Sequence, residues 1–430
     1  MLMDHFTRKI IFLFLFILSA KVVSAQWTIY NSSNTGGIQI DAVTSLKINS
    51  LGKIWIGSLD QGVSYYDGTA WTSYDNTTTG FPNVYIKSIY TSGSQTIAST
   101  GFNGVGKFAS GTWTTTNSSN GLVNDDVRGV FPDPGLHLWY ATDGGLSVDS
   151  ITQWRSFTTS NSPGMPTNHL TCVYVDHQNN NKWVGTFGAG LLKLTTTSNI
   201  YTWTKYNTTT SSIPSNNINK IATSSDNKLY VCTDAGLAIF DGSAAWTIYN
   251  HANSDGAITN DTIQDIAIDD QGNMYLATPD GLVLKTSATN IWTRYHSGNT
   301  NLPENKITAV DINSTSGDIW VGTSASGAAK NNRSNLLSTA DAIINAENVG
   351  LFPNPTEGEI HIVLDILSSS EEIHFILSDI TGKEITHEVE RKINPGIYNK
   401  TFTLAGAPAG IYLLKINTSG QALTKRIIKY

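Results

Sequence analysis

"VTSLKINSLGKIWIGSLDQGVSYYDGTAWTSY" occupies residues 43–74 and contains four short segments in which apolar and polar residues alternate. Gly, Asp and Asn separate these segments, and such residues favour the tight turns of β-hairpins. Alternation with a period of two is typical of β-strands that bury one face. We therefore predict that this stretch forms four consecutive antiparallel strands.

The same four-segment unit recurs along the chain. A Trp opens the fourth segment each time, at positions 27, 71, 113, 154, 203, 246 and 292. This spacing of roughly 40–50 residues is typical of propeller blades. The seventh unit ends at "GAAKNNRSN" (327–335) without a Trp segment, whereas "WTIY" (27–30) stands alone before the first unit. We predict that residues 27–30 complete the seventh blade and close the ring, which leaves no unpaired edge.

These units resemble the two-component-regulator propeller repeat. The resemblance rests on segments such as "IWVGT" at 319–323, on the Gly-Leu pair that follows in most units, and on "LPENKI" at 302–307. It implies a seven-bladed β-propeller of four-stranded blades. In that family such propellers often form the sensing part of membrane histidine kinases.

The composition agrees with an all-β fold. Residues 26–345 contain 22 Asp but one Glu, and Asp favours turns whereas Glu favours helices. The same region carries 16 Lys and Arg, which gives a net charge of −7 and argues against a nucleic-acid partner. Beyond residue 345 the acids are mainly Glu, so a different domain begins there.

The N-terminus predicts export. Arg8 and Lys9 precede an apolar run at 10–20, and the small-residue stretch "VVSA" at 22–25 follows it and ends at Ala25. We expect a secretory signal peptide at 1–25, since the run is too short to span a bilayer, and no later segment is apolar enough to do so. The expected mature chain is a propeller at 26–330, a linker at 331–347 and a small β-sandwich at 348–430.

The last segment resembles the C-terminal sorting domain of the type IX secretion system of Bacteroidetes. The matching motifs are "PNP" at 353–355, "DITGK" at 379–383, "GIYLL" at 410–414 and a basic final strand. The resemblance implies that residues 348–430 interact with the type IX translocon and its sorting peptidase. It also implies a protein that is secreted or held at the cell surface.

Candidate ligand-binding residues lie in the loops between the second and third strands of the units. These loops share one face of the predicted ring, and the candidates are Asp60, Phe102, Asn103, Asp143, Phe187, Asp234 and Asp280. Their polar oxygens suit sugar hydroxyls or a cation, and the two Phe rings suit stacking on a sugar. The alternative is turn chemistry, because Asp-Gly and Asn-Gly pairs favour tight hairpins.

No catalytic, cofactor or metal motif is present: the nine His are scattered, and no G-x-S-x-G or phosphate-binding loop occurs. Cys172 and Cys232 lie in neighbouring units, and a disulfide between them is one alternative. Cys232 also occupies a position that Gly, Ala or Ser holds in the other units, which favours a packed thiol.

We therefore expect a non-catalytic exported propeller that binds a glycan or a protein. The alternatives are a propeller-type polysaccharide lyase, which needs a convergent His, Tyr or Arg cluster, and a structural spacer.

Overall fold

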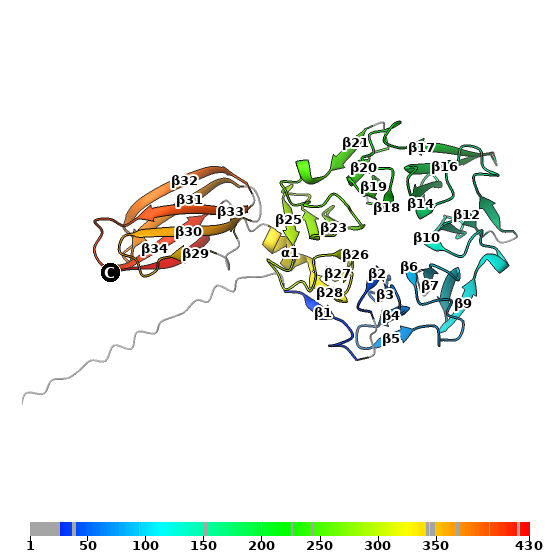
Figure 1. The fold of residues 1–430 in the computed structure, drawn as a ribbon, viewed down its shortest axis with the longest axis horizontal. Helices are drawn as coiled ribbons and strands as arrows, with labels where there is room; N and C mark the ends of the chain where they lie inside the picture. The colour runs from blue at the N-terminus through cyan, green and yellow to red at the C-terminus, as the bar shows by residue number, and fades with distance from the viewer. Residues whose placement is uncertain are drawn as a thin grey trace, which may run out of the picture.

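The computed structural model describes residues 26–36, 40–93, 95–149, 153–198, 200–224, 227–242, 245–340, 344, 349–366, 370–394, 396–418 and 422–430. A ring of small sheets and a separate sandwich make up this part of the chain (Figure 1). The predicted signal peptide, residues 1–25, lies outside the described residues.

The ring is a propeller of four-stranded antiparallel sheets around a central axis (Figure 1). The first three blades are β2 (Val43–Ile48), β3 (Ile54–Ser58), β4 (Val63–Tyr66), β5 (Trp71–Tyr74); β6 (Ile86–Ser92), β7 (Gln95–Thr100), β8 (Val105–Ala109), β9 (Thr112–Thr116); and β10 (Val127–Pro132), β11 (Leu138–Thr142), β12 (Gly145–Val148), β13 (Arg155–Phe157). The next three are β14 (Leu170–Asp176), β15 (Asn181–Thr186), β16 (Leu191–Thr197), β17 (Ile200–Tyr206); β18 (Ile218–Thr223), β19 (Leu229–Thr233), β20 (Gly236–Phe240), β21 (Trp246–Tyr249); and β22 (Asp265–Ile268), β23 (Met274–Thr278), β24 (Gly281–Lys285), β25 (Trp292–Tyr295). Short 3-10 turns, η1 (Ser118–Asn120) and η2 (His251–Asn253), lie between blades.

The seventh blade joins the two ends of the propeller chain. It consists of β26 (Ile307–Ile312), β27 (Asp318–Thr323), β28 (Ala328–Asn332) and β1 (Thr28–Tyr30), in the order β26-β27-β28-β1. Thr28 pairs with Lys330 and Tyr30 with Ala328 in antiparallel register. The predicted closure by the N-terminal strand is confirmed.

Neighbouring blades pack through aromatic rings and small residues. Trp55 of the first blade meets Trp113 of the second edge-on, with ring centroids 6.0 Å apart. A Cβ atom added to Gly57 would lie 2.4 Å from the Cγ2 atom of Ile86, so this position must stay small. Cys232 occupies the equivalent position in the fifth blade and is fully buried. The repeated Trp residues therefore serve blade packing, as the even period predicts.

A helix follows the last propeller strand. α1 (Arg333–Ala340) begins directly after β28, inside the predicted linker of 331–347. Leu336 of α1 is fully buried, and the Tyr295 hydroxyl donates a 2.6 Å hydrogen bond to the Leu336 carbonyl oxygen. The helix therefore packs against the propeller rather than spanning open solvent.

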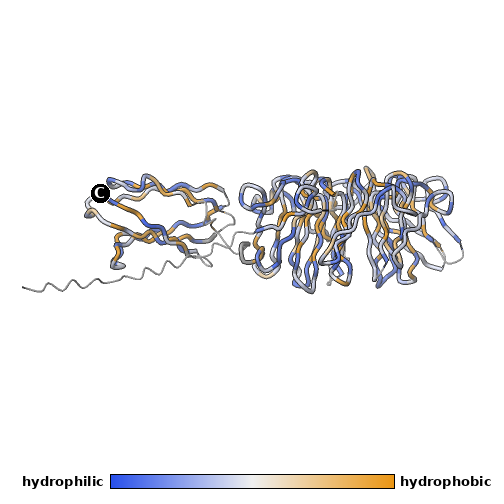
Figure 2. Tube along the Cα trace, turned by 90° about the horizontal axis from the view of Figure 1, so that it is seen from below, coloured by the Kyte–Doolittle hydropathy of each residue, from blue (hydrophilic) through white to orange (hydrophobic). Residues whose placement is uncertain are grey.

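The C-terminal domain is a sandwich of two antiparallel sheets. One sheet has the order β29 (Gly350–Phe352), β30 (Glu359–Ile366), β33 (Gly396–Thr403); the other has β32 (Glu384–Ile393), β31 (Ser370–Asp379), β34 (Gly410–Asn417), β35 (Ala422–Lys429). Ile362, Phe375 and Leu414 are fully buried between the sheets. Figure 2 shows polar and apolar segments alternating along the strands of both domains. The predicted fold class, an all-β propeller plus a small sandwich, is confirmed.

Candidate functional site

The innermost strands of the blades enclose a central channel. They are β2, β6, β10, β14, β18, β22 and β26, and consecutive members of this ring contact each other. The channel holds a cavity of about 590 Å³ lined by side chains from all seven strands. This volume lies within the usual range of about 300–1,000 Å³ for ligand pockets.

Each innermost strand starts at one mouth of the channel, beside the loops that carry the predicted site residues. Six of these strands have a β-bulge at their second residue, namely Thr44, Lys87, Arg128, Thr171, Asn219 and Thr308. A bulge leaves one residue outside the regular ladder and re-aims its side chain. The bulges therefore place a ring of polar residues at what we call the loop-side mouth.

Most of the predicted acceptors hold the loops in place. Asn103 Nδ2 donates to the Pro82 carbonyl oxygen at 2.9 Å, and the two Asp234 carboxylate oxygens accept from Asn217 and Asn219 at 2.9 Å. Asp280 accepts from Thr259, and Asp60 accepts from Ser58. Asp60 bonds within its own turn, whereas the partners of Asn103, Asp234 and Asp280 lie 15–21 positions away in the chain. The role of these four residues in binding a ligand stays a prediction.

Asp143 differs because it joins a charged cluster at the loop-side mouth. It lies 2.8 Å from the Arg128 guanidinium and 3.0 Å from Nδ1 of His169. Arg128 also contacts Asp126 at 3.0 Å. Burial alone would lower the pKa of Arg128, but Asp126 and Asp143 outweigh it and raise this pKa above its usual value. Arg128 therefore stays charged between two carboxylates.

The two predicted aromatic residues stand on either side of this cluster. Phe102 and Phe187 are 65% and 64% exposed, which is high for Phe. Phe102 contacts Tyr85 with ring centroids 5.6 Å apart, and the Tyr85 hydroxyl accepts a 2.7 Å hydrogen bond from the Lys87 ammonium. The Phe187 backbone N–H donates to the His169 carbonyl oxygen at 3.0 Å. The Phe102 ring is therefore linked through Tyr85 to Lys87, and the backbone of Phe187 is linked to that of His169.

The sequence reasoning missed Tyr85, Lys87, Arg128 and His169. Alternation alone does not show that the second residue of an inner strand is bulged toward the mouth. The signal was nevertheless present, because that residue is polar in every unit, including Gln264 in the sixth.

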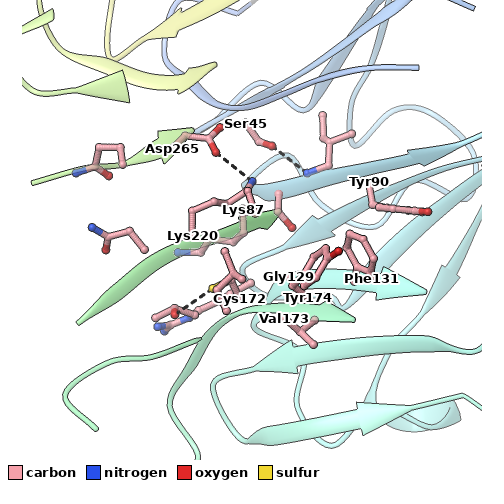
Figure 3. A pocket seen from close by; sticks show the side chains of 18 of the residues that line it. Ser45, Lys87, Tyr90, Gly129, Phe131, Cys172, Val173, Tyr174, Lys220 and Asp265 are labelled. Atoms are coloured by element: carbon pink, nitrogen blue, oxygen red, sulfur yellow. Dashed lines mark hydrogen bonds and ion pairs between the residues drawn. The ribbon is translucent and has the colours of Figure 1, made fainter. Parts of the chain in front are cut away.

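Deeper in the channel, ion pairs and aromatic rings lie on different sides. Lys220 pairs with Asp265 at 3.5 Å, and Lys47 with Asp311 at 2.8 Å. The Asp265 carboxylate raises the pKa of Lys220 in spite of its enclosure in the channel. Tyr90, Phe131 and Tyr174 form a row of rings on three adjacent strands (Figure 3).

The two cysteines are unbonded and buried, so the disulfide alternative is wrong. Burial raises the pKa of the Cys172 thiol to about 11, which keeps it protonated. Across the described residues, no group of three His, Cys, Asp or Glu side chains is arranged to hold a metal ion.

Comparison with known proteins identifies the C-terminal domain. Residues 350–430 match the family described as "Secretion system C-terminal sorting domain". The tail is a type IX sorting domain. The protein is therefore secreted or placed at the cell surface, as the tail motifs predict. No curated protein matches the chain. No helix in the described part of the chain has both the length and the apolar character that crossing a membrane requires.

Solved structures resemble the chain in fold. The extracellular domain of BT3049 from B. thetaiotaomicron, described as a hybrid two component system, shares 19% identity at a TM-score of 0.67, with 94% of this chain and 57% of that one covered. PorZ, described as a surface component of the type-IX secretion system of Porphyromonas gingivalis, shares 16% identity at a TM-score of 0.56 over 93% of this chain and 61% of PorZ. This chain thus spans less than two thirds of either relative. The WD40 propeller domain of Doa1 matches 71% of the chain at a TM-score of 0.51 and 12% identity. These likenesses confirm the propeller fold.

Proposed function

We propose that the chain is a non-catalytic surface propeller that binds a glycan at its loop-side mouth. The observation that carries this proposal is the arc from Phe102 through Tyr85 and Lys87 on one side, and from Phe187 through His169 to Arg128 on the other. Exposed rings and fixed polar groups around a concave opening are the usual features of a ligand site.

The arc suits a sugar chain for two reasons. The exposed rings of Phe102 and Phe187 offer flat apolar surfaces to the C–H face of a sugar. Lys87 forms no ion pair among the described residues, so its ammonium is available to a hydroxyl or carboxylate of the ligand. The polymer-sensing roles of the resembled repeat family favour a glycan over a protein ligand.

The sorting domain adds a second class of partner. We propose that residues 348–430 bind the type IX translocon and are then cut by its sorting peptidase. The match of residues 350–430 to sorting domains supports this assignment. The propeller would then act at the surface or in the medium.

A second candidate function is a polysaccharide lyase, because Tyr85, Arg128 and His169 lie around the same mouth. In such a β-elimination a base removes the proton at C5 of a uronic acid, and its electron pair forms the C4=C5 double bond. The C4–O bond then breaks, and the leaving oxygen takes up a proton. Arg128 is already held by two carboxylates, which leaves it little capacity to neutralise a substrate carboxylate and favours binding over catalysis.

The test is a glycan array combined with a product assay on residues 26–430. We expect one glycan class to bind without release of unsaturated uronyl products, which are detected by ultraviolet absorbance. Product formation would support the lyase. If the chain neither binds a glycan nor forms a product, the result supports a structural spacer. The double variant Phe102→Ala/Phe187→Ala should lose binding. Phe352→Ala, an exposed ring of the sorting domain, serves as the matched control.

A further inference from the structure

A second cleft opens between the fourth and fifth blades on the opposite face of the propeller. Its volume is about 470 Å³. It is lined by the β14–β15 hairpin, β16, β17, the β18–β19 hairpin and the turn after β20. Connections between first and second strands, and between third and fourth strands, lie at the propeller face away from the loop-side mouth. The cleft is therefore separate from the arc described above.

Aromatic rings form the floor of this cleft. Trp183 lies 5.6 Å from Tyr206 and 5.9 Å from Phe240, measured between ring centroids. Trp183 and Phe240 are buried, whereas Tyr206 is partly exposed. The Lys193 ammonium stands 5.2 Å from the centroid of the Trp183 ring. The floor is thus apolar and rigid, with one cation at its edge.

Polar groups line the rim of the cleft. Asp176 fixes the hairpin by accepting hydrogen bonds from the Gln178 backbone N–H and from Asn179 Nδ2, both at 2.9 Å. The Gln178 side-chain amide and the Tyr206 hydroxyl form no hydrogen bond with any described residue. An amide both donates and accepts, as does a hydroxyl, so these groups match the hydroxyls of a sugar.

Tyr174 and Thr223 line both the cleft and the channel cavity, and they form the wall between the two. The Tyr174 hydroxyl and Thr223 Oγ1 are hydrogen-bonded at 2.7 Å. From Tyr174 the row of rings extends to Phe131 at 4.7 Å and on to Tyr90 at 5.5 Å. Figure 3 shows these three rings side by side. Aromatic rings therefore lie on both sides of this wall, Trp183 and Tyr206 in the cleft and Phe131 and Tyr90 in the channel.

We propose that this cleft is a second saccharide site, which binds a neutral oligosaccharide. The charges of its lining cancel, because Asp176 opposes Lys193, and this favours an uncharged ligand. The partly exposed ring of Tyr206 fits the C–H face of a sugar, and the amides and the hydroxyl at the rim fit its hydroxyl edge. This site does not depend on the proposed function of the loop-side mouth.

The test is calorimetric titration of residues 26–430 with maltohexaose, xylohexaose and laminarihexaose. We expect at least one of them to bind. Gln178→Ala and Tyr206→Phe should each weaken that binding about 3- to 10-fold, since each removes one neutral hydrogen bond. Both changes leave the apolar packing in place, so the fold should persist. Tyr206→Ala, which also removes the ring, should weaken binding further.

Gln271→Ala is the matched control, because Gln271 lies in the equivalent hairpin of the sixth blade, between β22 and β23. It should bind like the wild type. The proposal is overturned if none of the three sugars binds. It is also overturned if Gln178→Ala and Tyr206→Phe bind like the wild type. A loss of affinity in Gln271→Ala as large as in those two variants would overturn it as well. If only the two Phe replacements abolish binding, the loop-side mouth is the site and the cleft is not.

Discussion

Replacing Trp27 by Ala tests whether the N-terminal strand closes the ring. Trp27 is 3% exposed and packs with Tyr295 and Leu302 in the seam between the sixth and seventh blades. Asn301 fixes its backbone, accepting from the Trp27 N–H at 2.6 Å and donating to the Trp27 carbonyl oxygen at 2.9 Å. The Trp27 side chain is thus buried in the seam, and its removal would leave a cavity there.

The expected loss follows from this burial. A buried Trp removes roughly 150–250 Å² from water, which corresponds to about 4–6 kcal/mol. Measured Trp→Ala changes in cores cost about 3–5 kcal/mol, and we expect the same loss in the free energy of unfolding. Deleting residues 26–34 should cost more, because it also removes the pairing of β1 with β28 and the stacking of Tyr30 on Trp320, whose centroids are 4.9 Å apart. The ring pair alone contributes about 0.5–1.5 kcal/mol. The deletion also exposes the edge of β28, which promotes association.

Tryptophan fluorescence during urea unfolding measures this change. All 11 Trp residues precede the sorting domain, so the signal reports the propeller alone. Light scattering after gel filtration gives the oligomeric state. Thr28→Ala is the control, since its exposed side chain should contribute less than about 0.5 kcal/mol. A Trp27→Ala protein within about 1 kcal/mol of the wild type, or a stable monomer without residues 26–34, would refute the closure argument.

Three further predictions concern export, binding and the thiols. Removing residues 349–430 should leave the propeller folded but trap it in the periplasm of a host with a matching type IX translocon; normal surface yield would contradict the sorting role. Replacing Phe102 and Phe187 by Ala should weaken binding of the glycan found on the array by about 1–3 kcal/mol, the size of lost aromatic contacts; unchanged affinity in titration would place the site elsewhere. Cys172 and Cys232 should resist thiol reagents in the folded protein and react after unfolding, because they are buried and protonated; rapid labelling of the native chain would contradict this burial.

The sequence predicts the fold well because its repeat is dense. Each unit supplies the same four strands, and the isolated strand at 27–30 has one blade in which it can pair. The helix α1 was not predicted because "RSNLLSTA" is short and largely polar. It is held to the propeller by Leu336, which is fully buried, and by the partly buried Leu337.

The candidate site was predicted less completely. Exposed loop residues such as Phe102 can be placed on one face by strand order alone. Lys87 and Arg128 reach the mouth because of β-bulges, which depend on backbone hydrogen bonding that the period-two pattern does not show. The cleft next to Tyr206 depends on the distance between two blades, and no local pattern gives that distance.

Ring closure also sets the order of events when the protein folds. The N-terminal strand is synthesised first, yet Trp27 and its partner Asn301 lie 274 positions apart along the chain. Contacts of such long range form slowly, because a large loop must close before they are gained. The first blades can form while synthesis continues, but the ring stays open until residue 332 is available. During that interval β1 and the first blade are without their neighbours, so an incomplete chain exposes strand edges that can pair with other chains.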